Sequence, residues 1–377
     1  MAFVFKSLKS LSSLMFTVVL LLLSLVLVFA GTLAQVELGI FRSQQIYFES
    51  FFLWGHIAGY SVPMLPAGYT IGGLLILNLL ANFVTRFRLQ VKHAGILCVH
   101  SGLILLLLGE VLTDVFSVES QLRLEEGAEK NYTESIFNYE LAVSRPIPAG
   151  RRVVAFPQVS LAAGADLSHS ELPVRIRVLQ YWPNSMLRRQ SVTAPAVADS
   201  GLGAGLSVVA LPRTGKMDER NVPSALVELF SGAEVLGTYL LSGHLAELEL
   251  IQLSDGAQLQ ASLRPVRYYM QSSIRLNDFI REVYPGTNKP SHFESQITLA
   301  GGDLPAPRSA RIYMNHPLRF EGRTYYQASF AGNDDVSILQ VVKNPSWLLP
   351  YFACGLVTLG LLWQSLSRFR ASKGAVS

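Results

Sequence analysis

Long apolar stretches alternate with polar segments along the chain, and they set the first expectation for its architecture. A helix needs about 20 apolar residues to cross a bilayer. Four stretches are long enough, and they comprise residues 14–33, 64–84, 94–112 and 346–366. The first is uncharged and longer than the apolar part of a cleaved signal peptide, so we interpret it as a retained anchor. The pattern predicts four transmembrane helices.

The segment between the third and fourth stretches, residues 114–345, has a different pattern. Short runs rich in Val, Ile, Leu and Tyr alternate apolar with polar positions, as half-buried strands do, and turn-forming residues separate them. The clearest runs are residues 174–182, 225–230, 246–253, 311–314 and 323–330. We therefore predict a large antiparallel all-β domain, built as a sandwich or a barrel-like sheet. The glycine-rich residues 198–222 are expected to form a loop or a weak hairpin without a phosphate-binding motif.

The loop between the first two predicted spans, residues 34–63, mixes aromatic with polar residues. Such a composition is typical of segments at the boundary between membrane and water. The aromatic side chains of Phe48, Phe51, Phe52 and Trp54 suit a helix that lies in this boundary. We therefore expect an interfacial loop that contains such a helix.

Basic residues are concentrated next to the predicted spans. Segments 1–13, 85–93 and 367–377 contain no acidic residue, and their basic residues are Lys6, Lys9, Arg86, Arg88, Lys92, Arg368, Arg370 and Lys373. By the positive-inside rule, these three segments are cytoplasmic, 367–377 as a basic tail, and residues 114–345 lie on the outer side. The formal net charge of +4 therefore reflects orientation, and we expect no nucleic-acid partner.

Composition narrows the chemistry further. Only 15% of the 377 residues are charged and the mean hydropathy is +0.33, whereas about a quarter are charged in soluble domains. The two cysteines, Cys98 and Cys354, form no CxxC pair, which argues against thiol redox chemistry or a zinc ribbon. The seven histidines form neither HxH nor HExxH, and no GxSxG or SxxK occurs, so hydrolase and metalloenzyme functions lack specific support.

His100 is the one residue that points to a site. It lies in the apolar stretch 94–112, where an ionisable side chain is costly and by default suggests a function. At six residues into the span, its depth is about 9 Å. A neutral imidazole there could be an axial ligand of haem iron. A histidine that is hydrogen-bonded to a serine or to a backbone carbonyl of a neighbouring helix fits its burial equally well.

His93 lies one heptad before His100, on nearly the same helix face but about 10 Å away, so the two cannot flank one iron. No other predicted span contains a histidine, and a second haem ligand must then come from a partner protein. We interpret His93 as an interfacial residue that meets haem propionates or lipid headgroups. Glycines of the spans either allow close helix packing or are ordinary membrane glycines; they are Gly72, Gly73, Gly95, Gly102, Gly355 and Gly360.

Six stretches in a fixed order carry a resemblance to a known family. They are residues 11–35, 92–114, 117–128, 274–286, 314–330 and 341–360. With three spans, a large outer domain and a final span, the sequence resembles the ResB-like (CcsB) family of system II cytochrome c biogenesis proteins. His316 belongs to the fifth stretch, and because a proline follows it we expect it to shape the turn before the strand at 323–330.

The resemblance implies a haem-handling subunit of the bacterial cytoplasmic (inner) membrane. Members of the family act with a CcsA (ResC) membrane protein to move haem b across the membrane and present it to apocytochrome c. His100 matches the family's membrane histidine that ligates haem. The resemblance also implies that the chain is no enzyme by itself, and that the thioether chemistry takes place on the partner or the apoprotein. The alternative is a membrane-anchored binding or sensor module without a cofactor.

Overall fold

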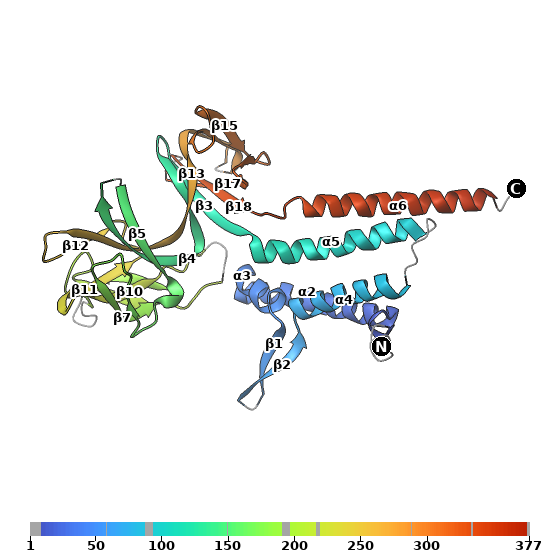
Figure 1. The fold of residues 1–377 in the computed structure, drawn as a ribbon, viewed down its shortest axis with the longest axis horizontal. Coiled ribbons are helices and arrows are strands. Elements are labelled where there is room, and N and C mark those ends of the chain that lie inside the picture. The colour runs from blue at the N-terminus through green and yellow to red at the C-terminus, as the bar shows by residue number, and fades with distance from the viewer. Residues whose placement is uncertain are drawn as a thin grey trace. The chain divides into compact units, whose positions relative to one another are not determined.

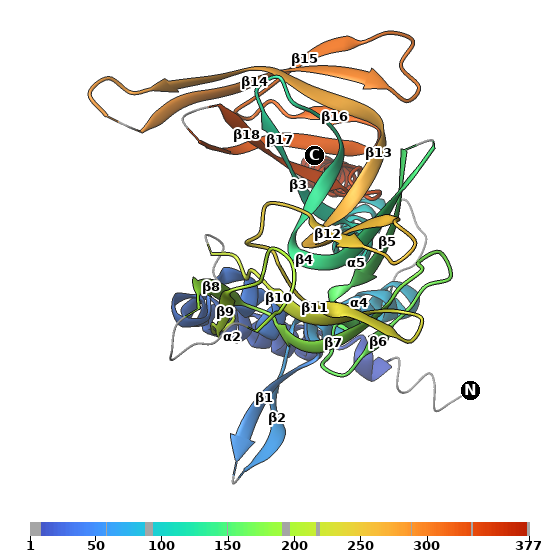
Figure 2. The ribbon, with the colours of Figure 1, turned by 90° about the vertical axis from the view of Figure 1, so that its left-hand side faces the viewer.

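The computed structural model describes residues 9–57, 59–86, 93–148, 150–190, 197–215, 219–287, 289–332 and 335–374. The chain divides into two compact units. The first comprises Met1–Val118, Gly215–Glu219 and Asn344–Ser377 and contains the long helices (Figure 1). The second comprises Glu119–Thr214 and Arg220–Lys343 and contains the large sheets (Figure 2).

Among its described residues, the first unit has four helices that are long and apolar enough to cross a membrane. They are α2 (Leu14–Leu38), α4 (Gly68–Arg86), α5 (Ala94–Phe116) and α6 (Leu349–Gly374). The four spans predicted from the sequence are therefore confirmed as helices. Their ends differ, since α2 continues past residue 33 and α4 begins only at Gly68. Of the basic residues used to predict orientation, Lys6, Arg88 and Lys92 lie outside the described residues.

Hydrogen bonds of a buried amide join α2 to α4. Asn78 of α4 is fully buried, its Nδ2 donates to the Leu11 carbonyl over 2.6 Å, and its Oδ1 accepts from Thr17 Oγ1 over 2.9 Å. An unsatisfied amide in hydrocarbon would cost several kcal/mol. These bonds therefore fix how α2 packs against α4.

Glycines allow α5 and α6 to approach each other closely. Gly95, Gly102 and Gly109 are buried and recur every seven residues of α5, about two helical turns, so they share one face. A Cβ at Gly102 would lie only 2.8 Å from the carbonyl oxygen of Ala353. A Cβ at Gly95 would lie equally close to the Gly360 carbonyl oxygen, at 2.8 Å. We call this row of contacts the glycine seam.

The seam decides between the two interpretations of the span glycines. Gly95, Gly102 and Gly360 belong to it, so close packing is confirmed for these three. A Cβ would meet nothing within 4 Å at the other predicted positions, which are Gly72, Gly73 and Gly355.

Between α2 and α4 the chain forms a short helix α3 (Ile40–Ser43), a π-helical turn over Gln44–Phe48, and a hairpin of β1 (Phe52–Ile57) and β2 (Tyr60–Pro66). The predicted interfacial helix is therefore wrong for these last residues. Gly59 supplies the left-handed backbone of the hairpin turn, with φ at 84°. Prolines within β2 also oppose a helix, because they lack the N–H that a helix needs.

The second unit consists of paired strands, and every pair of named strands with a described register is antiparallel. A four-stranded sheet has the order β11-β10-β7-β6. A ten-stranded sheet follows the path β15-β14-β13-β4-β3-β18-β17-β16, with β12 and β5 beside it, and β8 pairs with β9 separately. The predicted antiparallel all-β domain is confirmed.

The strands have the following bounds: β3 (Val118–Glu125), β4 (Glu129–Ile147), β5 (Gly150–Pro157), β6 (Asp166–Leu167), β7 (Arg175–Trp182), β8 (Ser185–Arg189), β9 (Leu206–Ala210), β10 (Ser224–Ser231), β11 (Glu234–Ser242), β12 (Glu249–Gln252), β13 (Gln258–Val283), β14 (Pro290–Gly301), β15 (Arg308–Tyr313), β16 (Leu318–Phe320), β17 (Arg323–Ala331) and β18 (Val336–Lys343). The glycine-rich segment thus supplies β9 of a short hairpin as well as loops.

Two long strands, β4 and β13, run through both halves of the second unit. The first part of β13 pairs with β12 and with the end of β4, where Gln260 faces Ser144. Its last part pairs with β14, where Ile274 faces Leu299. The register shifts beside Pro265, whose missing N–H interrupts the ladder and favours a bulge. The two halves therefore share continuous strands.

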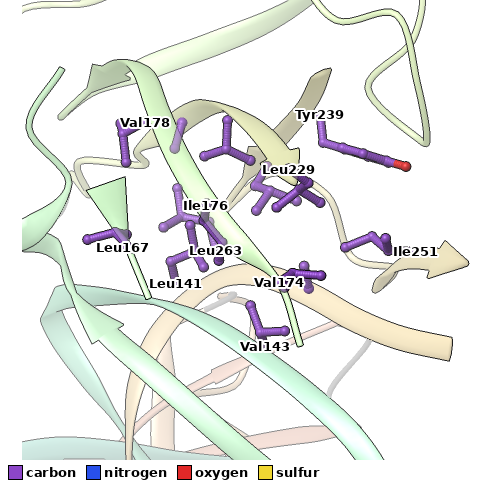
Figure 3. Close-up of a cluster of buried hydrophobic side chains, with 14 of the residues drawn as sticks. Leu141, Val143, Leu167, Val174, Ile176, Val178, Leu229, Tyr239, Ile251 and Leu263 are labelled. Carbon is purple, nitrogen blue, oxygen red and sulfur yellow. The ribbon is translucent and has the colours of Figure 1, made fainter. Parts of the chain in front are cut away.

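Each half has its own hydrophobic core. In the first, side chains of β4, β7, β10, β11 and β13 point toward one another (Figure 3). Its most buried members include Leu141, Val143, Val178, Ala225 and Val227. The second core is formed by β3, β13, β14, β15, β17 and β18, and it includes Leu124, Ile274, Leu276, Ile297 and Tyr325. Alternate burial along β7 and β10 shows why period-two patterns predicted these strands.

The second core lies inside a sheet that closes almost into a barrel. Its terminal strands β15 and β16 approach at a bridge between Tyr313 and His316. The His316 N–H donates to the Tyr313 carbonyl over 2.9 Å, and the two rings stack with centroids 4.2 Å apart. Asn315 between them adopts a positive φ of 62°. His316 thus occupies the turn in which the sequence placed it.

An ion pair between the buried carboxylate of Glu294 and the exposed guanidinium of Arg311 joins β14 to β15, and it predicts a pH-dependent stability. Glu294, whose side chain is 4% exposed, accepts hydrogen bonds from Nε and Nη2 of Arg311 over 2.7 and 2.5 Å. The Arg311 guanidinium lowers the pKa of Glu294 below its usual value, and the amide of Gln296 adds to this. Because the pKa of Glu294 is lower in the folded state than in the unfolded state, its ionised form stabilises the fold when the pH is above the unfolded-state pKa. This stabilisation is lost as the pH falls through the folded-state pKa.

We therefore expect the unfolding midpoint to fall as the pH decreases from about 7 to about 3, and Glu294→Gln to flatten this dependence. Thermal unfolding of the detergent-solubilised chain followed by circular dichroism would measure it. Glu171→Gln is the matched control, since its pair with Arg152 is exposed and contributes little. An equally steep pH dependence in Glu294→Gln would contradict the prediction.

Candidate functional site

His100 lies at the end of the second turn of α5, among the apolar side chains of that helix. Its Nδ1 is 2.9 Å from the carbonyl oxygen of Ile96, one turn earlier in the same helix. A carbonyl can only accept a hydrogen bond, so this contact places the proton on Nδ1. In the neutral imidazole, Nε2 then carries the lone pair that can ligate a metal. The local helix geometry therefore selects the tautomer that suits an axial ligand.

Two opposite faces of α5 carry different residues. Two residues of α-helix correspond to a rotation of about 200°, so His100 lies almost opposite Gly102. Because Gly102 faces α6 in the glycine seam, the imidazole is directed away from α6. This arrangement leaves the histidine on the side of α5 that α6 does not cover.

His93 begins the same face but is not brought near His100. It is the residue that precedes α5, with φ at −102° and ψ at 0°. The seven residues between the two histidines correspond to about 10 Å along the helix. Within the described part of the chain, no group of three or more His, Cys, Asp or Glu side chains could hold a metal ion. The described residues thus supply single imidazoles on this face.

A polar pair lies at the other end of α5. The Tyr69 hydroxyl of α4 donates to Oδ2 of Asp114 over 2.7 Å. Fourteen residues separate Asp114 from His100, which is about 3.9 turns, so both lie on nearly the same face. Burial raises the pKa of Glu49, and the negative charge of nearby Asp114 raises it further. The face of α5 opposite the seam therefore runs from histidines at one end to a carboxylate at the other.

The pair of Tyr69 and Asp114 is not predicted by the sequence. Asp114 could have been found from the sequence, because it is spaced by multiples of seven residues from His93 and His100 and so lies on the same helix face. The partner Tyr69 comes from another helix, and a contact between helices leaves no periodic trace in the sequence. This pair is thus a site that only the fold brings together.

The other histidines make local contacts. His244 Nε2 lies 2.8 Å from the Ser185 carbonyl, His56 Nε2 lies 3.2 Å from Ser61 Oγ, and His169 Nδ1 accepts from the Glu171 N–H over 3.2 Å. His292 Nε2 lies 3.5 Å from Glu294. These contacts hold turns and strands in place.

The fold defines the class of protein. It is a membrane protein with four candidate spans and a large antiparallel β unit. Residues 242–346, which include β12 to β18 but not β3 and β4 of the nearly closed barrel, match the ResB-like family. The resemblance to this family is therefore confirmed.

Relatives extend the likeness to more of the chain. The protein NrfI of Wolinella succinogenes is 25% identical over 307 residues, which are 81% of this chain and 31% of that protein. The cytochrome c biogenesis protein Ccs1 of Heterosigma akashiwo is 33% identical over 26% of this chain and 23% of its own length. The cytochrome c biogenesis protein CcsB of Prochlorococcus marinus is 39% identical over 16% of this chain and 14% of its own. The matches thus cover at most 31% of these relatives.

Proposed function

We propose that this chain is a subunit of a cytochrome c biogenesis complex that binds haem b through His100. The names of its relatives support the process, since Ccs1 and CcsB are both cytochrome c biogenesis proteins. The observation that carries the residue assignment is the orientation of His100, directed away from α6 and with its proton on Nδ1.

His100 fits one axial position of haem iron. Its Nε2 carries the lone pair, and the bond from Nδ1 to the Ile96 carbonyl holds the ring in place. The surrounding side chains of α5 are apolar, which suits the porphyrin ring. When bound, haem would be the cargo of the complex, and this chain would hold its iron from one side.

The second axial ligand then comes from a partner, a CcsA (ResC)-type membrane protein that docks on the face of α5 opposite the glycine seam. His93, at the start of this face, would meet the haem propionates or lipid headgroups. In the orientation given by the basic residues, both termini are cytoplasmic in a bacterial inner membrane, and the β unit is on the outer side where apocytochrome c receives haem. With only two cysteines and no CxxC pair, the chain leaves thiol chemistry to the partner or the client.

A haem spectrum of the purified complex tests this function. The chain is co-expressed with a CcsA-type partner, and absorbance gives the haem bound per complex. We expect His100→Ala to lose most of the haem and added imidazole to restore part of it, because free imidazole can occupy the vacant axial position. The matched control is His169→Ala, an exposed histidine of the β unit, which should keep its haem.

Two results would overturn the proposal. Undiminished haem in His100→Ala would remove the ligand assignment. A wild-type complex that never contains haem would favour the membrane-anchored binding module without a cofactor. Reporter fusions at Ser377 test the orientation separately, since a reporter that is active only outside the cytoplasm should be silent there.

A further inference from the structure

The hairpin β1–β2 exposes large apolar side chains without any charged residue. Residues 52–66 contain no Asp, Glu, Lys or Arg, and their ionisable side chains are His56 and Tyr60. Its exposed large side chains are Phe52, Trp54, Ile57, Tyr60, Met64 and Leu65, with Trp54 at 63%. A two-stranded hairpin is marginally stable in water by itself, and such a surface would be costly there.

The base of the hairpin is fastened at the start of α4 and against residues 23–31 of α2. The Ala67 N–H, just before α4, donates to the Phe51 carbonyl over 3.0 Å. Phe48 packs so tightly on α2 that a Cβ at Gly31 would lie 2.9 Å from its ring. A small cavity lies between the hairpin and α2, and its lining is Leu23, Val26, Leu27, Ala30, Leu53, Leu65 and Pro66. The hairpin base therefore abuts the apolar part of α2.

The hairpin projects sideways from α2 and α4, crosswise to both helices (Figure 1). A segment at the end of a spanning helix that runs crosswise to it lies along the membrane surface. The hairpin is thus placed near the boundary between acyl chains and headgroups at the level where α4 begins.

The strand register separates two faces of the hairpin. Leu53 pairs with Leu65 and Ile57 pairs with Tyr60, and paired side chains point to the same face. Leu53 and Leu65 line the cavity on α2, so this face is directed toward the apolar residues of the span. His56 pairs with Ser61 on the opposite face, where their side chains lie 3.2 Å apart.

Backbone chemistry favours the boundary over the bilayer centre. Each strand of a two-stranded sheet has an outer edge whose backbone groups need water or headgroups as partners, which the hydrocarbon centre does not provide. Pro63 and Pro66 reduce this need in β2, because proline has no N–H. Tryptophan and tyrosine are themselves enriched at membrane boundaries.

We propose that β1–β2 is an in-plane lipid anchor, with Leu53, Ile57 and Leu65 toward the acyl chains and His56 and Ser61 toward the headgroups. It attaches one leaflet to the start of α4 and would keep α2 and α4 at a fixed height. This inference is independent of haem and of His100.

Depth-dependent quenching of Trp54 fluorescence tests the anchor. Trp182, Trp347 and Trp363 are replaced by phenylalanine, and the full chain is reconstituted in phosphatidylcholine vesicles with bromine near the headgroup or near the acyl end. We expect the shallow label to quench Trp54 more strongly than the deep label, because in-plane elements lie about 5 to 10 Å into the boundary. A chain that retains only Trp363, exposed on α6, gives the positive control for lipid contact.

Two variants test which face meets the lipid. In the chain with Trp54 alone, Ile57→Asp should reduce quenching by the shallow label, whereas Ser61→Asp on the opposite face should leave it unchanged. Absence of quenching by either label would overturn the anchor, as it would mean that water or protein surrounds the hairpin. Stronger quenching by the deep label, or equal effects of the two aspartates, would also contradict it.

Discussion

Gly102→Val is expected to separate α5 from α6 and to abolish haem binding by the complex. A Cβ at residue 102 would lie 2.8 Å from the Ala353 carbonyl oxygen and 2.5 Å from Val357 Cγ2, and valine adds two further carbons. Overpacking of this kind typically costs about 1 to 3 kcal/mol. The neighbouring His100 would shift with the helix, so the haem content should fall together with the midpoint of thermal unfolding.

Gly355→Val is the matched control, since it places the same side chain on α6 where a Cβ meets nothing within 4 Å. Both variants replace a helical glycine by valine, so they differ only in whether the new side chain enters the glycine seam. Haem absorbance and unfolding midpoint are measured on the two purified complexes. Equal effects of the two substitutions would show that the seam does not position α5.

Tyr325→Ala is expected to have the largest effect on the β unit. This side chain of β17 is fully buried in the second core, and its hydroxyl contacts Met270 Sδ over 3.2 Å. Burial also raises the pKa of Tyr325 to about 12, so it stays neutral. Truncation of a buried aromatic residue costs about 3 to 5 kcal/mol because it removes apolar contacts and leaves a cavity. That loss is a large part of the stability of an ordinary domain.

Tyr326→Ala provides the control one residue along the same strand. Tyr326 points to the other face of the sheet and is 40% exposed, so its removal should change the unfolding free energy by much less. Denaturant unfolding followed by near-ultraviolet circular dichroism would compare the two variants. If Tyr326→Ala destabilised the chain as much as Tyr325→Ala, the assignment of the barrel core would be wrong.

Hydropathy predicted the helices because a helix that spans the bilayer needs about 20 apolar residues, and a run of this length is visible in the sequence. It did not predict their partners. Gly102 and Ala353 are far apart in the chain, and no sequence pattern indicates that they are in contact. Likewise, the sequence singled out His100 by its apolar surroundings, but its orientation follows from the seam on the opposite face of α5.

The β unit was predictable to a similar degree. Alternation found strands such as β7 and β17, since one face of each is buried. The division into two cores was not predictable, because it depends on a register in which β4 and β13 pair with different neighbours along their length. The hairpin β1–β2 was missed for a related reason, since its aromatic residues suit an interfacial helix as well as an interfacial strand.

The glycine seam also has a consequence for biosynthesis. About 230 residues separate the end of α5 from the start of α6. At about 5 to 20 residues per second, the ribosome needs roughly 12 to 50 seconds to make them. During this time α5 is in the membrane with its glycine face uncovered, and the β strands have been made before the last helix arrives. Assembly of the four spans must therefore finish last, after the final helix has been inserted.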